Sequence, residues 1–217
     1  KATMASCITA WCLFAAMPAH SANLAIWPID PRINADALST NVWVKNNDPQ
    51  SDVVLQARVL RWRQDNNTDI HEPQNDIVVS PPTAKVKPGD QQLFRLVNRS
   101  GAVVNVPNEL SYRIIVDEIP SENSLTTSGL SFQMRYSLPL FVGLPAEHKK
   151  KADAERHRVI AQGLAYRLID GPKKSIEIHN RGKLNARLSR IKIMTAGNEV
   201  VPISDGLWGY VLVGASK

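Results

Sequence analysis

The chain has 217 residues, two cysteines (Cys7 and Cys12) and a formal net charge of +6. The basic charge would suit nucleic-acid binding, but it equally suits a groove that accepts a carboxylate. The five histidines show no metal-ligand spacing, and the sequence has no nucleophile elbow, Walker loop or dinucleotide fingerprint. Composition and motifs therefore give no support to an enzyme, a metal site or a bound cofactor.

Residues 1–22 have the pattern of a secretory signal peptide. Lys1 is a short basic region, Cys7–Met17 is an apolar run, and Ala19–Ala22 provides small residues for cleavage. The apolar run is too short for a membrane-spanning helix, which needs ~20 residues. Cleavage predicts a mature chain that begins near Asn23, contains no cysteine, and relies on its core rather than on disulfides. Export also removes the chain from contact with nucleic acid.

The next part of the chain, residues 23–145, alternates apolar and polar residues with the period of β-strands. The longest strand, 129–141, places Leu130, Phe132, Met134, Tyr136, Leu138 and Leu140 on one face. Other strands are predicted at 37–44, 53–62, 77–79, 92–97 and 112–117. About seven strands in roughly 120 residues predict an immunoglobulin-like β-sandwich.

Residues 146–217 contain a second series of strands. The polar stretch 148–158 is interpreted as an interdomain loop or linker. Strands are predicted at 164–169, 174–180, 188–194 and 208–213. Because a sandwich domain normally has near 100 residues, we expect a second immunoglobulin-like domain that is incomplete in this chain. The predicted fold class is thus all-β, with two sandwich domains.

Several stretches resemble the periplasmic chaperones of the chaperone–usher pilus pathway, in particular the archaic, Csu-type class. They are Ile26–Ile29, Ser80–Pro82, Pro88–Gly89, Tyr112–Pro120 and Ser131–Phe141, with weaker matches at Ile178–Asn180 and Gly209–Leu212. The resemblance implies two domains set at an angle with a cleft between them. It also implies a periplasmic, non-enzymatic protein without cofactors, which binds a pilus subunit one-to-one and delivers it to an outer-membrane usher.

The resemblance implies that a strand is lent to the subunit, whose own sandwich lacks its final strand. We expect Leu130, Phe132, Met134, Tyr136 and Leu138 to form this donor set, because they share one apolar face. The same periodicity is compatible with burial in the chaperone's own core, which is favoured for Leu138 and for Leu140.

The family also holds the subunit's C-terminal carboxylate, through a Lys of the donor strand and an Arg of the first strand. The position matching that Lys is Pro139, so the pair cannot be carried over. If 112–117 and 129–141 form an antiparallel hairpin, Arg113 lies across from residues 136–139 and becomes the first candidate anchor. Arg32 is the second. Alternatively, Arg113 pairs with Asp117 or Glu118, and Arg32 is simply exposed.

A secreted adhesive or carbohydrate-binding sandwich is the competing hypothesis. Trp27, Trp43 and Trp62 could stack on sugars, although tryptophans at strand ends more often belong to a core. A fibre subunit should be a single incomplete domain, and the two strand series disfavour that interpretation.

Overall fold

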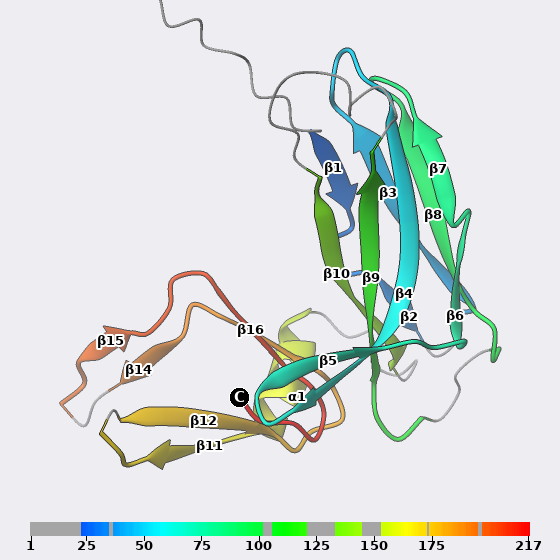
Figure 1. The fold of residues 1–217 in the computed structure, drawn as a ribbon. Helices are drawn as coiled ribbons and strands as arrows, with labels where there is room; N and C mark the ends of the chain where they lie inside the picture. Colours follow the sequence, from blue (N-terminus) through cyan, green and yellow to red (C-terminus); the bar gives the residue numbers. More distant parts are fainter. Residues whose placement is uncertain are drawn as a thin grey trace, which may run out of the picture.

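The structure is a computed structural model that describes residues 23–34, 37–101, 106–120, 133–144, 153–172, 174–194 and 197–217. The predicted signal peptide, Leu130 and Phe132 lie outside these residues. The chain forms two lobes set at an angle (Figure 1). The first lobe comprises the described residues of 23–144, and the second those of 153–217. No helix in the described part of the chain is long and apolar enough to cross a membrane.

The first lobe consists of two β-sheets packed face to face. One sheet has the order β1-β3-β8-β6, and the other has the order β2-β10-β9-β4-β5, with β7 also paired to β4. The strands of the first sheet are β1 (Leu24–Trp27), β3 (Ser39–Asn46), β8 (Gln91–Asn98) and β6 (Ile77–Ser80). Those of the second are β2 (Arg32–Asn34), β10 (Arg135–Leu144), β9 (Leu110–Ile119), β4 (Val53–Asp65), β5 (Thr68–Glu72) and β7 (Thr83–Val86). The predicted sandwich is therefore present.

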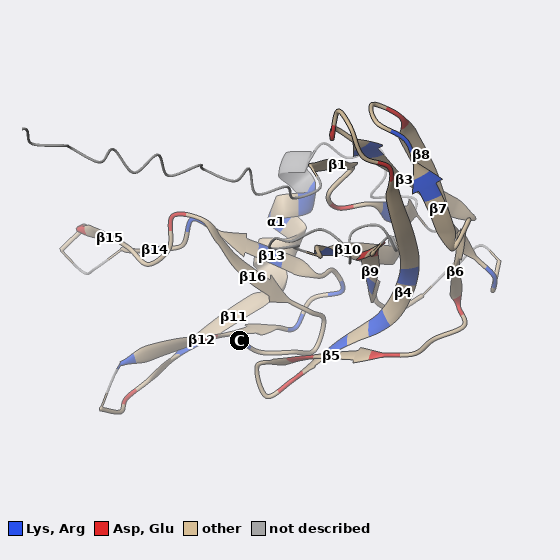
Figure 2. Cartoon of the chain, turned by 45° about the horizontal axis from the view of Figure 1, so that its top comes forward, with Lys and Arg blue, Asp and Glu red and all other residues tan. Residues whose placement is uncertain are grey.

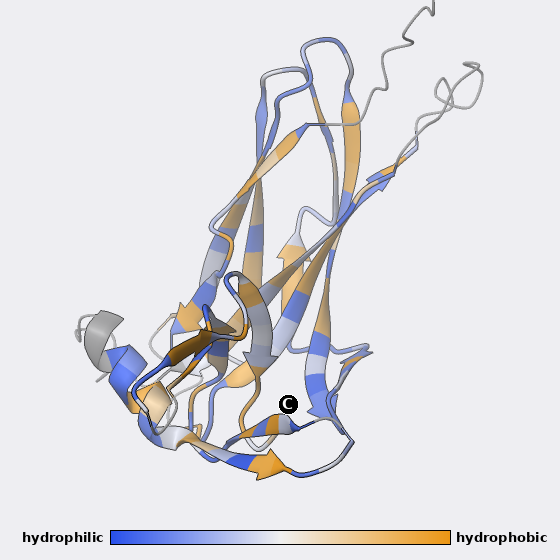
Figure 3. Cartoon of the chain, turned by 90° about the vertical axis from the view of Figure 1, so that its left-hand side faces the viewer, coloured by the Kyte–Doolittle hydropathy of each residue, from blue (hydrophilic) through white to orange (hydrophobic). Residues whose placement is uncertain are grey.

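One continuous core lies between these two sheets. Apolar and polar residues alternate along the strands, as the banding of orange and blue shows (Figure 3), and alternate residues of a strand lie on the same face of its sheet. The fully buried members of the core include Val42, Val44, Leu55, Phe94, Leu96, Ile114, Val116 and Leu140. The alternation seen in the sequence therefore reports the inward face of each strand.

The antiparallel hairpin of β9 and β10 has the register expected from the sequence. Pro139 is the partner of Arg113, within a ladder that runs from Arg135 opposite Asp117 to Val142 opposite Leu110. The described part of this strand begins at Arg135, later than the predicted start at residue 129.

The second lobe begins with a helix, α1 (Asp153–Gly163), where the sequence was interpreted as a loop or linker. That interpretation was wrong for residues 153–158. The segment lacks an internal Pro or Gly and is rich in helix-forming Ala, Glu, Arg and Gln. Its polarity on all sides removed the apolar periodicity by which a helix is recognised.

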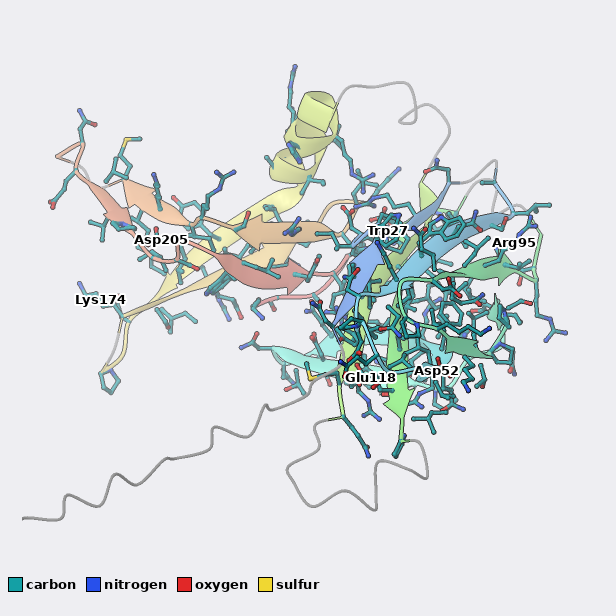
Figure 4. The ribbon with its side chains drawn as sticks, turned by 90° about the horizontal axis from the view of Figure 1, so that it is seen from above. Trp27, Asp52, Arg95, Glu118, Lys174 and Asp205 are labelled. Atoms are coloured by element: carbon teal, nitrogen blue, oxygen red, sulfur yellow. The ribbon has the colours of Figure 1, made fainter. Side chains whose placement is uncertain are left out.

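Among the described residues after α1, six strands pair as three separate two-stranded sheets. The strands are β11 (Leu164–Ile169), β12 (Ser175–Asn180), β13 (Ala186–Ser189), β14 (Lys192–Met194), β15 (Val200–Pro202) and β16 (Leu207–Val211). The pairs are β11 with β12, β13 with β16, and β14 with β15. The single strand predicted at 188–194 is two strands, interrupted at Arg190, whose φ is +52°. Figure 4 shows Lys174 and Asp205 far from Asp52 and Arg95 of the first lobe.

Replacement of Leu140 by Ala tests the core of the first lobe. Leu140 is fully buried, so Leu140→Ala should lower the free energy of unfolding by about 2–5 kcal/mol, measured by urea denaturation. Leu38→Ala is the matched control, because Leu38 is 54% exposed, and it should change stability by less than about 0.5 kcal/mol. Equal effects of the two changes would contradict the assigned core.

Candidate functional site: an open strand edge and a buried arginine between the lobes

Strand β10 has a long stretch of edge without a strand partner among the described residues. On one side it pairs with β9 along its length. On the other side β2 pairs only with Phe141, Val142 and Leu144. The edge from Arg135 to Leu140 therefore has no strand partner among the described residues. Arg135 and Ser137 are exposed, so this end of the edge is open to another strand, whereas Leu138–Leu140 are buried.

The expected donor residues on this strand differ in exposure. Met134, just before β10, is 42% exposed. Tyr136 is half-buried, and its hydroxyl donates to Glu118 Oε1 at 3.4 Å. Leu138 is only 7% exposed and packs within the core of the first lobe. In the free protein, Leu138 at the inner end of the proposed donor set is therefore already buried in the protein's own core.

Burial acts on the polar pair at the open end of this strand. Burial raises the pKa of the Glu118 carboxyl, although hydrogen bonds from the Met134 backbone and from Tyr136 oppose the shift. Burial and the neighbouring Glu118 both raise the pKa of the Tyr136 phenol. The Glu118 carboxylate is therefore hydrogen-bonded to Tyr136 and is not the ion-pair partner of Arg113.

Arg113, the first candidate anchor, is held between the two lobes. Its guanidinium carbon lies 3.7 Å from the ring centroid of Trp62 on β4 and 5.4 Å from that of Tyr210 on β16. The nearest carboxylate is that of Asp69 on β5, with 4.0 Å between Nη2 and Oδ2. The Arg113 side chain is 13% exposed.

The hydrogen-bonding capacity of Arg113 is only partly used. Its buried Nε has no hydrogen-bond partner within the described residues. Burial lowers the pKa of the guanidinium, while Asp69 and Tyr210 oppose this shift. A buried guanidinium with an unmet N–H and one long ion pair can accept a carboxylate through charge-assisted hydrogen bonds.

The expected alternative partners of Arg113 are engaged elsewhere. Asp117 accepts from Arg135 Nε at 2.5 Å and pairs with Arg58 Nη1 at 2.9 Å. These charges lie on the face of the second sheet that is turned away from the core. Basic bands lie along β4 and acidic residues mark β5 (Figure 2).

Arg32, the second candidate, is neither exposed nor free. Its Nη1 donates to Glu109 Oε1 at 2.7 Å, and its guanidinium carbon lies 4.8 Å from the Phe141 ring centroid. Burial lowers the pKa of Arg32, whereas the Glu109 carboxylate raises it. The Arg32 guanidinium, which was the second candidate anchor for a subunit carboxylate, is therefore already paired with Glu109.

The Glu109 carboxylate joins the two lobes. Its side chain is 1% exposed. Besides Arg32, it accepts from Arg156 of α1 at 3.1 Å. Its other oxygen accepts from the main-chain and side-chain nitrogens of Asn185, at 2.9 and 3.0 Å. Asn185 in turn accepts from the Val213 N–H through Oδ1 at 3.0 Å.

Gln64 makes a second polar link between the lobes. Its Nε2 donates to the Tyr210 carbonyl at 2.9 Å, and its Oε1 accepts from the Leu212 N–H at 2.8 Å. Its side chain thus bonds the main chain at the end of β16 and just after it, as a neighbouring strand would. The same Nε2 donates to Asp69 Oδ1 at 2.8 Å, which ties the carboxylate facing Arg113 to the joint.

An aromatic cluster fills the space between these polar links. Trp62, Phe141 and Leu212 are buried, with Tyr210 and Ala215 packed against them. The Trp62 centroid lies 6.2 Å from that of Phe141 and 5.4 Å from that of Tyr210. A cavity of about 290 Å³ opens beside this cluster and is lined by both lobes, although Arg113 is not part of its lining.

Two tryptophans expected in the core lie on the surface instead. Trp27 of β1 is paired in register with Trp43 of β3, and the two are 38% and 37% exposed. Both side chains point away from the core. On β3 the residues on either side of Trp43, Val42 and Val44, point into the core and are fully buried. Only Trp62 of the three has the burial expected of it.

Sequence reasoning missed the residues that build the joint. Glu109, Gln64 and Asn185 belong to no motif, and each has a partner more than 70 positions away in the chain. The sequence also gave no indication that the rings of Trp62 and Tyr210 lie against the Arg113 guanidinium. The described residues contain no group of three or more His, Cys, Asp or Glu side chains placed to hold a metal ion.

A comparison with known families decides the identity. The sequence profile for pili and flagellar-assembly chaperones, PapD N-terminal domain, matches residues 32–147, more than half of the chain. The chain belongs to the family of pili and flagellar-assembly chaperones. The open edge of β10 and Arg113 both lie within the matched residues.

Solved structures agree with this assignment. A chain of the CsuC–CsuE chaperone–tip adhesion subunit pre-assembly complex, from archaic Csu pili of Acinetobacter baumannii, is 32% identical. The match covers 90% of this chain and 88% of that one, with a TM-score of 0.63. The CupB2 chaperone of Pseudomonas aeruginosa, 16% identical over 89% of this chain and 86% of its own, shares the fold with a TM-score of 0.58. No match was found among curated protein sequences.

Substitution of Glu109 by Gln tests the joint of this chaperone. It removes the charge but keeps the shape, so Arg32 and Arg156 lose their common counter-ion. We expect a loss of unfolding free energy near the lower end of the about 3–5 kcal/mol typical of a broken buried pair, because Arg32 is partly in water. Glu72→Gln is the control, since the Glu72–Arg63 pair is exposed, and it should leave the urea midpoint unchanged. An unchanged midpoint in Glu109→Gln would refute the assigned role.

Proposed function

We propose that this chaperone acts in the periplasm, binds one pilus subunit through the open edge of β10, and passes it to an outer-membrane usher. The observation that carries the proposal is the unpartnered stretch Arg135–Leu140, next to the buried and under-paired Arg113. A subunit strand would add to this edge by main-chain hydrogen bonds. The action is binding rather than catalysis, and it requires no cofactor.

The domain division belongs to the same proposal. We infer an N-terminal domain of residues 23–145 and a C-terminal domain of 146–217, preceded by the signal peptide. Strand β10 ends at Leu144 and the second lobe begins with α1 at Asp153, which supports a boundary between them. Large apolar side chains stay exposed on the second lobe, among them Tyr166 at 72%, Leu168 at 71% and Met194 at 69%.

The proposed donor set is Leu130, Phe132, Met134 and Tyr136, with Leu138 at its inner end. Met134 is the member best placed to enter a subunit, because it is exposed and lies at the open end of the edge. Full burial of such a side chain contributes roughly 1.5–3 kcal/mol. Leu138 contributes indirectly, by fixing the strand on the core.

We assign the subunit's C-terminal carboxylate to Arg113 rather than Arg32. Arg113 has an unpartnered Nε and a long ion pair, whereas Arg32 is bound by Glu109 at 2.7 Å. Arg113→Ala should therefore weaken the subunit complex by about 2–5 kcal/mol, the cost of truncating one partner of a buried charged pair. The measurement is co-purification from the periplasm, followed by a binding titration of the purified complex.

Two further variants separate anchoring from folding. Arg113→Lys keeps the charge but loses the bidentate geometry, so its complex should be intermediate in strength. Arg95→Ala, on the opposite sheet, should bind as the wild type does. If Arg113→Ala is as stable as the wild type and binds the subunit equally well, Arg113 is not the anchor.

Met134→Asp tests the donor strand. The substitution should leave the free chaperone stable, because Met134 is 42% exposed and a carboxylate there can reach water. It should prevent complex formation, since the carboxylate would enter an apolar groove. Met194→Asp, at an exposed Met of the second lobe, is the matched control and should bind normally. Loss of binding in both variants would point to a general effect of the charge.

One observation favours the second candidate, an adhesive or carbohydrate-binding surface module. The exposed Trp27 and Trp43 lie side by side in register on the first sheet and could stack on sugar rings. Binding to a glycan array that is lost in Trp43→Ala, without any subunit complex, would support this alternative over the chaperone.

A further inference from the structure

The exposed end of the β10 edge carries a guanidinium that is only partly neutralised. The side chain of Arg135, the first residue of β10, is 66% exposed, and its Nε donates to Asp117 Oδ1 at 2.5 Å. The other carboxylate oxygen of Asp117 pairs with Arg58 Nη1 at 2.9 Å. Because one carboxylate serves two guanidinium groups, the three side chains together carry an excess positive charge.

These three charges lie in a row that begins at the edge of the sheet. The strands follow the order β10-β9-β4, and Arg135 is the register partner of Asp117, so both side chains lie on the same face. Arg58, on β4, meets the carboxylate from the side away from the edge. Of the three side chains, Arg135 is the most exposed, at 66% against 42% for Arg58 and 14% for Asp117. The excess charge is therefore presented on the edge strand itself.

Within the described residues, Asp117 is the one carboxylate that pairs with Arg135. Glu118 follows Asp117 on the same strand, so its side chain lies on the opposite face of the sheet. The neighbouring positions on the face of Arg135 are Gln56, the β4 partner of Asp117, and Ser137, and both are uncharged. With Nε engaged, the terminal nitrogens of the Arg135 guanidinium keep N–H groups for a further acceptor.

The main chain at Arg135 is oriented to receive a strand. The Glu118 N–H donates to the Met134 carbonyl at 3.1 Å, so Met134 directs its main-chain groups toward β9. Successive residues direct these groups to opposite sides, so those of Arg135 point to the side that has no strand partner. A strand that paired there would place one residue beside Arg135, on the same face, with Cβ atoms about 4.5–5.5 Å apart.

We propose that Arg135 selects a subunit strand that carries Asp or Glu at the facing position, on the side of the sheet turned away from the core. This inference rests on the proposed function and adds a specificity-determining residue to it. A carboxylate would meet free N–H groups of a guanidinium, whereas Lys or Arg would meet an excess positive charge, and facing like charges destabilise a strand pair. Since Met134 and Tyr136 lie on the opposite face, apolar burial and charge selection belong to different sides of one strand.

Substitutions that keep or remove the charge of Arg135 test the proposal. The probe is the pilus subunit that co-purifies with the wild-type chaperone from the periplasm. In about 0.01 M NaCl, where charges are weakly screened, Arg135→Gln should raise Kd about 2- to 5-fold, the range for one cross-strand charge pair. Arg135→Lys keeps the charge and should bind nearly as the wild type does. In about 1 M NaCl the screening length falls to about 3 Å, so wild type and Arg135→Gln should bind alike.

Two controls separate charge selection from other effects. Arg95→Gln removes the same charge from the opposite sheet and should leave Kd unchanged at both salt concentrations. The urea midpoint of Arg135→Gln should stay close to that of the wild type, because Asp117 keeps its pair with Arg58.

Chemical coupling identifies the group that position 135 meets. In the Arg135→Lys complex, a carbodiimide joins the introduced amine to a neighbouring carboxylate as an amide and takes up the water as a urea. Mass spectrometry of the digested complex locates the bond, which we expect at an Asp or Glu side chain of the subunit. A bond to Asp117 alone, or to the C-terminal carboxylate that is assigned to Arg113, would overturn the proposal.

These outcomes are distinguishable from failure of the proposed function. If the wild type co-purifies with no subunit, the proposed function fails and this inference fails with it. If the wild type binds a subunit and Arg135→Gln binds it equally tightly at both salt concentrations, only the inference about Arg135 is refuted.

Discussion

The arrangement of the two lobes depends on one buried carboxylate. Glu109 has almost no contact with solvent, and an ion in such a place requires hydrogen-bonding partners. It obtains them from Arg32 on β2, Arg156 on α1 and Asn185 before β13. Because these partners come from both lobes, satisfying a single side chain fixes how the lobes meet.

The apolar cluster at the joint could not do this alone. Contacts of Trp62, Phe141 and Tyr210 stabilise the joint, but they tolerate small rotations, since hydrophobic burial has little directionality. The bonds of Glu109 and Gln64 are directional. They hold Tyr210 near Arg113, so the proposed anchor exists only when the lobes are correctly joined.

Part of this organisation could be predicted from the sequence, and the physical reason is local periodicity. The alternation along residues 129–141 and the facing strand 112–117 were enough to place Arg113 across from residues 136–139, and the observed register narrows this to Pro139. The helix α1 was missed because it has no apolar stripe, and β7 and β15 were missed because three or four residues carry too little pattern.

The joint itself was beyond local reasoning. Glu109 and Arg32 are separated by 77 positions, and Glu109 and Asn185 by 76. Nothing in the neighbourhood of any one of them indicates the other two. The exposure of Trp27 and Trp43 was missed because alternation along a strand does not show which of its two faces points to solvent when both carry large residues.

The burial of Trp62 gives this chaperone an internal optical probe. Its indole N–H is buried and has no hydrogen-bond partner in the described part of the chain, and the Arg113 guanidinium lies against its ring. Trp27, Trp43 and Trp208 are all more exposed than Trp62, so their fluorescence emission should lie at longer wavelength than that of Trp62. A ligand that draws Arg113 away, or a rotation of one lobe, would change the blue edge of the spectrum and leave the rest in place. Occupancy of the cleft could then be followed in the unlabelled protein, in real time.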